Sequence, residues 1–545
     1  MMKKLFSILF ISIFIVDCSK QKNNESKNRP NIIVIMADDL GYSDLGCYGG
    51  EIETPNLDTL ANGGIRFTQF YNAARCCPTR ASLLTGKYPH QVGLDKNGQS
   101  LSRNAATIAE VLKENGYRTG MTGKWHLSET KELKNPKEQL LWLSHRKDDN
   151  VFAPLKSYPS NRGFEQHWGV IWGVINFFDP FSLVHNEKEI KNVPDDFYMT
   201  DFITDKSIDL IDEFSKDQNP FFLYVAHTAP HWPLHALPED ILKYKGVYDE
   251  GWNKLRENRY KGLIEKGIIK PETAPLAKNE SGKLWAENKE KAWESKHMEA
   301  HAAMVDRMDQ GIGRLIDKLK KTGEYKNTLI LFLADNGASS ERGYPPGFDR
   351  PGHNRNGEEI IYPNQKYNRP GGELTWGYLG DAWAGALNAP FRYWKRESFE
   401  GGICSPFIMH WPEGLRGKEN TINYGVSHVI DILPTFLEIT ATSYPDTING
   451  FKTTPIEGRS MLPLIKGEAK STNDTLFWEH ETGKALRVGD WKISALIGGE
   501  WELFNLAKDR TETNNLAAIM AEKVEEMEAV WLQEYKRIFK VTNNN

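Results

Sequence analysis

Cysteine is scarce in this chain, with only five among 545 residues. Two of them, Cys76 and Cys77, are adjacent, and the remaining cysteines give no disulfide framework. On composition alone, the adjacent pair could be a strained vicinal disulfide, two buried thiols or half of a zinc site. A structural zinc ion takes about four protein ligands, and no second cysteine pair is present to supply them.

The chain also lacks internal repeats and a glycine loop of the dinucleotide-binding type, because Gly311-Ile312-Gly313 has no third glycine at the required spacing. Lysine and arginine number 68 against 73 aspartates and glutamates, a formal net charge of −5. This balance argues against nucleic acid as a partner. A polyanionic substrate would have to meet positive charge concentrated at its binding site.

The most informative stretch is residues 76–86, which reads Cys-Cys-Pro-Thr-Arg-Ala-Ser-Leu-Leu-Thr-Gly. It resembles the motif Cys-x-Pro-Ser-Arg-x-x-x-Leu-Thr-Gly of the formylglycine-dependent sulfatase family (type I, arylsulfatase-like), with Thr79 where serine is commoner. The resemblance implies that a formylglycine-generating enzyme oxidises Cys76 to an aldehyde, which Arg80 holds in place. In the hydrated aldehyde, one hydroxyl attacks the sulfur of the ester. The other hydroxyl then loses its proton, so that the carbonyl re-forms and sulfate is expelled.

Two polar pairs follow apolar runs that predict buried parallel strands, Asp38-Asp39 after residues 31–36 and Asp335-Asn336 after residues 329–333. Ligands of open α/β sheets bind beyond the carboxyl ends of the strands. Carboxylate and amide oxygens suit calcium or magnesium, whereas each pair alone could be a solvated turn. The sulfatase resemblance implies that all four side chains bind one calcium ion, with the modified Cys76 completing the ligand set.

Transfer of a sulfate group needs fixed positive donors around its oxygens. Residues 123–126 read Gly-Lys-Trp-His and follow a strand expected at 117–122. They match a Gly-Lys-Trp-His motif of the sulfatases. The resemblance implies that Lys124 and His126 contact the aldehyde and the ester.

Residues 227–233 follow another expected strand, at 221–226, and contain two prolines that exclude a regular helix. The family resemblance assigns a sulfate contact to His231, between the prolines, and favours a structural role for His227. Lys395 precedes a Glu-Gly-Gly turn by five residues, and the resemblance makes it the last sulfate-binding donor. Cys404 begins a Cys-Ser-Pro that departs from the family's usual Arg-Val-Pro, and its role stays open.

Strand-like runs alternate with helix-like stretches such as residues 105–115 and 298–321, which predicts an α/β fold whose mostly parallel sheet is sandwiched by helices. The resemblance implies an alkaline-phosphatase-like large domain, here 30–471, and a small C-terminal α+β subdomain with an antiparallel sheet, here 472–545. In the subdomain we expect short strands at 486–488, 491–495 and 501–504 and an amphipathic helix at 517–539.

The first 16 residues carry two lysines and then an apolar core too short to span a membrane, as in an export signal. Cys18 and the polar residues after it resemble a bacterial lipoprotein signal (1–18) followed by a tether (19–29). Asp17 is a poor residue at such a site, so simple cleavage of the signal is the alternative. We expect an exported protein, either periplasmic or a lipid-anchored lipoprotein of the outer membrane or cell surface.

These features predict a sulfatase that acts on sulfated polysaccharide fragments. The alternatives are a general arylsulfatase, a phosphonate or phosphodiester hydrolase of the same superfamily, and a non-catalytic glycan-binding lipoprotein. Segment 165–181 is rich in aromatic residues, which could line a sugar-binding cleft or pack in the core. The Gly- and Pro-rich segment 344–377 resembles a long functional loop beside Asn336.

Overall fold

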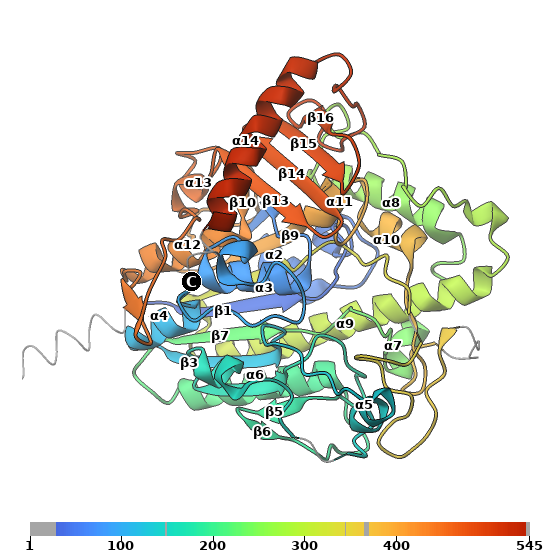
Figure 1. Cartoon of the computed structure of the whole chain (residues 1–545), viewed down its shortest axis with the longest axis vertical. Helices are drawn as coiled ribbons and strands as arrows, with labels where there is room; N and C mark the ends of the chain where they lie inside the picture. Colours follow the sequence, from blue (N-terminus) through green and yellow to red (C-terminus); the bar gives the residue numbers. More distant parts are fainter. Residues whose placement is uncertain (1–28, 148–149, 344, 364–369, 541–545) are drawn as a thin grey trace, which may run out of the picture.

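The computed structural model describes residues 29–147, 150–343, 345–363 and 370–540. Within them, ten strands form one sheet in the order β10-β2-β9-β8-β1-β7-β3-β4-β5-β6 (Figure 1). The strands are β1 Asn31–Ala37, β2 Ile65–Tyr71, β3 Arg118–Lys124, β4 Gln166–Val170, β5 Leu183–His185, β6 Lys188–Glu189, β7 Phe221–Ala226, β8 Thr328–Ala334, β9 Cys404–His410 and β10 Thr421–His428.

The centre of the sheet, from β8 through β1, β7 and β3 to β4, is parallel. Every residue of β1, β7 and β8 is buried, as expected for parallel strands covered on both faces. Antiparallel pairing occurs outside this centre, where β9 lies between β8 and β2 and where β5 and β6 form one edge. The predicted parallel sheet and the strands predicted at 31–36, 117–122, 221–226 and 329–333 are confirmed.

The strand predicted at 117–122 extends further than expected, through Lys124. Gly123 has a φ of 92° and lies so close to β7 that an added Cβ would come within 1.9 Å of the Ala226 carbonyl oxygen. Only glycine tolerates both the left-handed backbone and this close approach. The strand can therefore continue and place Lys124 at its carboxyl end.

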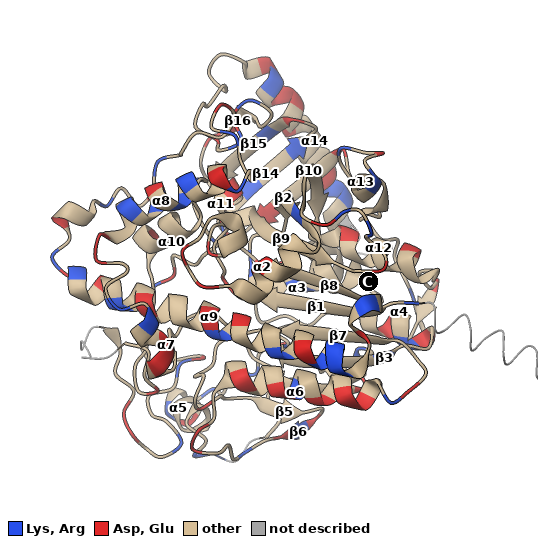
Figure 2. Cartoon of the chain, turned by 180° about the vertical axis from the view of Figure 1, so that it is seen from behind, with Lys and Arg blue, Asp and Glu red and all other residues tan. Residues whose placement is uncertain are grey.

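Helices cover both faces of the sheet, and alternate residues of β1 pack against them. On one face, Ile33 and Ile35 pack in a core shared with α2, α6 and α9, the last two of which cross the view in Figure 2. On the other face, Ile32 and Val34 pack in a core shared with α3, α4 and α12. These helices are α2 Pro55–Asn62, α3 Cys76–Thr85, α4 Ile108–Glu114, α6 Met199–Phe214, α9 Lys291–Thr322 and α12 Ile432–Thr440.

A separate antiparallel sheet, β13-β14-β15-β16, forms the C-terminal part of the chain, and α14 (Ala521–Lys540) packs along it (Figure 1). Its core includes Phe477, Leu486, Ile493 and Trp531. The predicted antiparallel subdomain and its amphipathic helix are confirmed, while the boundary at residue 472 stays a prediction. The strands are β13 Thr475–His480, β14 Gly483–Val488, β15 Trp491–Leu496 and β16 Glu502–Asn505.

Shorter elements fill the connections between these layers. They are α5 Pro136–Leu143, α7 Pro238–Lys243, α8 Gly251–Glu265, α10 Asp381–Leu387, α11 Glu400–Ile403, α13 Leu462–Lys466 and a small hairpin of β11 Thr447–Ile448 and β12 Phe451–Lys452. In the described part of the chain, no helix has the length and apolarity that crossing a bilayer requires. The predicted signal at 1–18 and nearly all of the tether at 19–29 lie outside the described residues.

Candidate functional site

The predicted site residues gather at the carboxyl ends of four neighbouring parallel strands, β8, β1, β7 and β3. Asp335 and Asn336 follow β8, Asp38 and Asp39 follow β1, and Lys124 is the last residue of β3. The segment with His227 and His231 follows β7. Parallel strands end at the same edge, so residues up to 298 positions apart in sequence meet there.

The two acidic pairs contact each other directly. The Asn336 Nδ2 donates to Asp39 Oδ1 at 2.7 Å, and the Asp39 backbone N–H donates to Asp335 Oδ1 at 3.1 Å. Asp39 has a left-handed φ of 67°, a conformation that aspartate tolerates better than most residues. This turn in the backbone lets Asp39 face the end of β8 rather than continue β1.

Two oxygens of this cluster, Asp38 Oδ1 and Asn336 Oδ1, are buried and have no hydrogen-bond partner. Buried polar atoms are rarely left in this state unless an ion or a water satisfies them. Burial and the Asp38 carboxylate raise the pKa of Asp335 well above its usual value. Buried carboxylate and amide oxygens without hydrogen bonds fit a hard divalent cation such as calcium.

Basic side chains surround the acidic cluster. Lys124 Nζ lies 2.6 Å from Asp38 Oδ2, and Arg80, fully buried in α3, donates to Asp335 Oδ2 from NH2 at 2.8 Å and from Nε at 3.2 Å. Although burial favours the neutral acid, Lys124 and the other neighbouring cations lower the pKa of Asp38 to about 2. The structure thus brings Arg80 to the carboxylates, and its predicted contact with a modified residue 76 stays a prediction.

Cys76 is the first residue of α3 and is only 2% exposed. A hydrogen bond with Cys77 and the nearby His126 and Lys124 lower the pKa of the Cys76 thiol well below its usual value. The Cys77 Sγ lies 2.9 Å from the His126 carbonyl oxygen, which accepts from the thiol. Neither cysteine forms a disulfide.

Cys76, Cys77 and His126 place their ligand atoms within 4.8 Å of one another, which would suit the zinc alternative. This group offers three ligand atoms among the described residues, however, whereas a structural zinc ion takes about four. Among the described residues, the acidic cluster is therefore the better metal site.

His231 and Lys395 meet at the Asp39 carboxylate. The Lys395 Nζ lies 3.0 Å from Asp39 Oδ2 and 3.3 Å from His231 Nε2. The His231 Nδ1 lies 2.5 Å from the Trp232 carbonyl oxygen, an acceptor only, so Nδ1 carries the hydrogen and Nε2 faces the cluster. His227 is buried, and the structural role favoured for it stays a prediction.

Glu341 is a site residue that the sequence did not indicate. Its Oε2 lies 2.9 Å from Lys395 Nζ and accepts a hydrogen bond from Trp232 Nε1 at 3.2 Å, while Oε1 lies 3.9 Å from Arg75 NH2. Burial favours the neutral acid, but Lys395 and His231 hold the pKa of Glu341 well below its usual range. The Glu341 carboxylate thus contacts Lys395, Trp232 next to His231, and Arg75 next to Cys76.

A cavity of about 220 Å³ opens above these residues. Cys76, His126, His231 and Lys395 line its floor and sides, and Phe348 lies at the wall, 40% exposed. The loop segment predicted at 344–377 therefore does reach the site. The other lining residues are Arg75, Asn97, Gly98, Thr130, Trp172, Gly173, Val174, Trp232, Glu341, Asp349 and Arg350.

The aromatic segment 165–181 is mostly core. Phe177 and Phe181 are at most 5% exposed, and Trp168 stacks on His185 with ring centroids 3.6 Å apart. Of the five aromatic residues considered in this segment, only Trp172 lines the cavity, where its ring stacks with Phe348 at 5.8 Å. Trp168 does not line the cavity, because strand pairing places its ring against His185 of β5.

The sulfatase family model matches residues 30–442, and a second model, N-sulphoglucosamine sulphohydrolase C-terminal, matches residues 391–538. An uncharacterized sulfatase of Schizosaccharomyces pombe is 33% identical over 94% of each chain. An arylsulfatase of Klebsiella aerogenes is 32% identical over 82% of this chain and 94% of its own length.

Two solved structures share the architecture over most of both chains. Ps i-CgsB in complex with k-i-k-neocarrahexaose has a TM-score of 0.64 and 25% identity, covering 92% of this chain and 93% of its own. BT4656 in complex with its substrate D-glucosamine-2-N,6-O-disulfate has a TM-score of 0.62 and 22% identity, covering 94% and 98%. With a family model spanning most of the chain and relatives similar over nearly their whole length, the chain belongs to the sulfatase family and is a sulfuric ester hydrolase.

Proposed function

We propose that this sulfatase removes sulfate from sulfated saccharides, with a formylglycine made from Cys76 as its nucleophile. The observation that carries the proposal is the position of Cys76 on the floor of a cavity into which Lys395, His126 and His231 also project. Lys124 lies below them, against Asp38. A maturation enzyme of the formylglycine-generating type would have to act on Cys76 before folding buries it.

Asp38, Asp39, Asp335 and Asn336, with the modified residue 76, are the side chains that would hold a calcium ion. The two unpaired buried oxygens support this assignment. When bound, the ion supplies Lewis-acid stabilisation of negative charge on the sulfate oxygens.

Charge stabilisation and proton transfer are assigned to side chains of the protein itself. Lys124 and Lys395, each held by a carboxylate, supply fixed positive charge to a sulfate group. Burial lowers the pKa of His126 to about 4, so its imidazole is neutral at pH 7 and can accept a proton from a hydroxyl at position 76. His231 lines the cavity, and in its imidazolium form, with a hydrogen on both Nδ1 and Nε2, it would deliver the Nε2 proton to the departing ester oxygen.

A saccharide is favoured as the leaving group by the cavity wall. Phe348 offers an exposed ring there, with Asn97 and Arg350 beside it. Aromatic faces pack against the apolar faces of sugars, and amide or guanidinium groups bind their hydroxyls or further anionic groups. The ligands bound in the two structural relatives are both saccharides, which supports the same substrate class.

We also propose export of the protein, as a periplasmic enzyme or as a lipoprotein anchored through Cys18. The support is the sequence pattern of the first 18 residues alone. Labelling with a radioactive fatty acid and comparison with Cys18→Ala would decide between the lipid anchor and simple cleavage.

The function is tested by comparing kcat/KM on D-glucosamine-2-N,6-O-disulfate and k-i-k-neocarrahexaose with kcat/KM on nitrophenyl sulfate and nitrophenyl phosphate. We expect at least one saccharide to exceed nitrophenyl sulfate, because a good leaving group needs little of the binding energy that the wall supplies. A higher value on nitrophenyl sulfate than on every saccharide would instead indicate a general arylsulfatase. A higher value on the phosphate ester would indicate a phosphohydrolase.

A further inference from the structure

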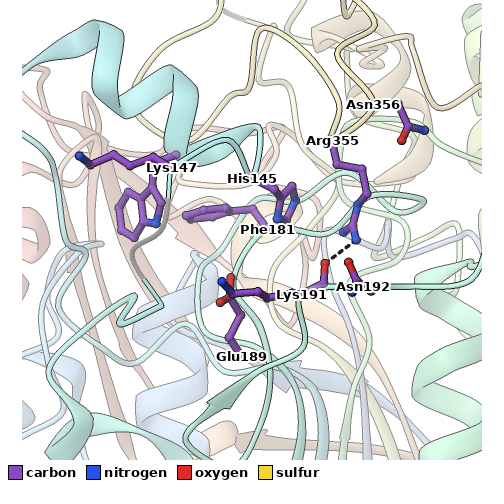
Figure 3. Close-up of a pocket in the computed structure, with 9 residues that line it drawn as sticks. His145, Lys147, Phe181, Glu189, Lys191, Asn192, Arg355 and Asn356 are labelled. Atoms are coloured by element: carbon purple, nitrogen blue, oxygen red, sulfur yellow. Dashed lines mark hydrogen bonds between the residues drawn. The ribbon is translucent and has the colours of Figure 1, made fainter.

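A second cavity, of about 320 Å³, lies apart from the catalytic one, and no step proposed above uses it. Four segments that are distant in sequence build it, as Figure 3 shows. Trp142, His145 and Lys147 come from the end of α5 and the residues after it, and Phe181 comes from the loop before β5. The other lining residues are Glu189, Lys191, Asn192, Arg355 and Asn356.

The lining of this accessory cavity is suited to an oxyanion on a sugar. Lys147, Lys191, Arg355 and His145 are basic, whereas Glu189 is the one acidic side chain that lines the cavity. The salt partner of Lys147, Glu138, is a largely exposed residue outside the lining. Two amide side chains and two aromatic rings complete the wall, a combination that binds hydroxyls and apolar sugar faces together with the anion.

Arg355 is held in place but retains an unused donor. Its backbone N–H donates to Asp179 Oδ2 at 2.8 Å, its Nε donates to the other oxygen of Asp179, and its NH1 donates to the Lys191 carbonyl at 2.6 Å, the contact dashed in Figure 3. The NH2 group is buried and has no hydrogen-bond partner. A guanidinium fixed in this way holds its positive charge at the cavity wall, where it can attract a sulfate group.

The accessory cavity adjoins the catalytic cavity through one aromatic layer. Trp172 lines the catalytic cavity, and its ring lies edge-on to Trp142 at 5.6 Å and to Phe181 at 5.1 Å, both of which line the accessory cavity. Arg350 and Arg355 also belong to the same loop, so their Cα atoms are at most about 18 Å apart. An oligosaccharide of a few units can therefore span both cavities.

We propose that the accessory cavity binds a second sulfate-ester group of a polysulfated oligosaccharide whose scissile ester occupies the catalytic cavity. The inference rests on the proposed saccharide function and narrows its substrate class from a sulfated sugar to a chain with several sulfate groups. The binding energy of such a contact is the same in the ground state and in the transition state. Removing the contact therefore raises KM and leaves kcat unchanged.

The test compares Lys191→Ala with Lys188→Ala, a loss of the same charge from an exposed residue that does not line the cavity. The measured quantity is kcat/KM on k-i-k-neocarrahexaose divided by kcat/KM on D-glucosamine-2-N,6-O-disulfate. With Lys191→Ala this ratio should fall about tenfold, because the hexaose loses one charge-assisted contact and its KM rises. With Lys188→Ala the ratio should stay within twofold. Equal losses in the two variants would show general attraction to a basic surface and overturn the proposal.

Binding measured without turnover separates this proposal from the proposed function. In a Cys76→Ala background, calorimetric titration with k-i-k-neocarrahexaose should give a Kd about tenfold weaker when Lys191→Ala or Arg355→Lys is added, with the melting temperature unchanged. Inorganic sulfate alone should bind in the millimolar range and compete. If the hexaose binds equally to all variants, the accessory cavity has no role, whatever the enzyme hydrolyses. If the wild type hydrolyses only aryl sulfates but the variants still differ in hexaose affinity, the proposed function fails and the binding site stands.

Discussion

The carboxylate of Glu341 lies 2.9 Å from the Lys395 amine, which the sulfatase resemblance assigns to sulfate binding. A carboxylate beside an anion-binding site repels the anion and lowers its affinity, unless the carboxylate also positions a group that contributes more to binding or catalysis. Glu341 also accepts from Trp232 and lies near Arg75, the residues that flank His231 and Cys76. It therefore ties together three segments that carry site residues.

Glu341→Gln should lower kcat about 10- to 100-fold on any sulfate ester, because Lys395 loses one of the two carboxylates that position it, and small misplacements carry costs of this size. If Glu341 acts through Lys395, adding Glu341→Gln to Lys395→Ala should cause no further loss. Glu481→Gln removes the more exposed partner of Arg75 and should change kcat less than threefold. Additive losses in the double variant would show that Glu341 acts independently of Lys395.

Cys76→Ala should abolish turnover while leaving the melting temperature within a few degrees of the wild type, because the side chain is small and α3 stays packed on the sheet. Mass spectrometry of the active wild type should find an aldehyde at position 76, which relative to cysteine has lost the sulfur, the thiol hydrogen and one hydrogen of Cβ and has gained one oxygen. Cys77→Ala is the matched control and should retain the aldehyde. A fully active Cys76→Ala enzyme would refute the mechanism.

Calcium removal should inactivate the enzyme and lower its melting temperature, because the acidic cluster then has buried oxygens without partners. At a calcium concentration one hundred times Kd, binding should stabilise the fold by about 2.7 kcal/mol. Asp38→Asn should weaken calcium binding, whereas Asp209→Asn, an exposed acid on α6, should not. A crystal structure with calcium should place oxygens of Asp38, Asp39, Asp335 and Asn336 about 2.3–2.6 Å from one ion. Separate ions at the two pairs would contradict a single shared site.

The sequence predicted the parts of the site that follow directly from strand order. Asp38 and Asp335 each come right after a wholly apolar run, so the rule that ligands bind beyond the carboxyl ends of parallel strands places them together. The cysteine motif and the Gly-Lys-Trp-His segment were recognisable because their residues are adjacent in the chain.

The rest depends on packing between distant segments. Glu341 meets Lys395 across 54 residues, and nothing in the intervening sequence indicates the contact. Trp168 and Trp172 are equally aromatic, but the first stacks on His185 and the second lines the cavity, a difference set by strand register and the loop that follows. Composition cannot separate a core ring from a cavity ring, since both bury most of their surface.

The last prediction concerns the junction between the large sheet and the C-terminal sheet. Lys492 of β15 is fully buried and lies 3.0 Å from Glu400 of α11 and 2.7 Å from Glu512. Burial lowers the pKa of Lys492, and the Glu512 carboxylate opposes this shift. Removing one partner of a buried ionic cluster leaves uncompensated charge, which costs about 3–5 kcal/mol.

Lys492→Met should therefore lower the free energy of unfolding measured in urea by about that amount, and the added substitution Glu512→Gln should recover part of the loss because it removes one unpaired carboxylate. Lys216→Met, which breaks the exposed pair with Asp212 on α6, should leave the unfolding midpoint unchanged. If Lys492→Met shifted the unfolding in urea as little as Lys216→Met does, apolar packing alone would hold the two sheets together, and this ionic cluster would not contribute.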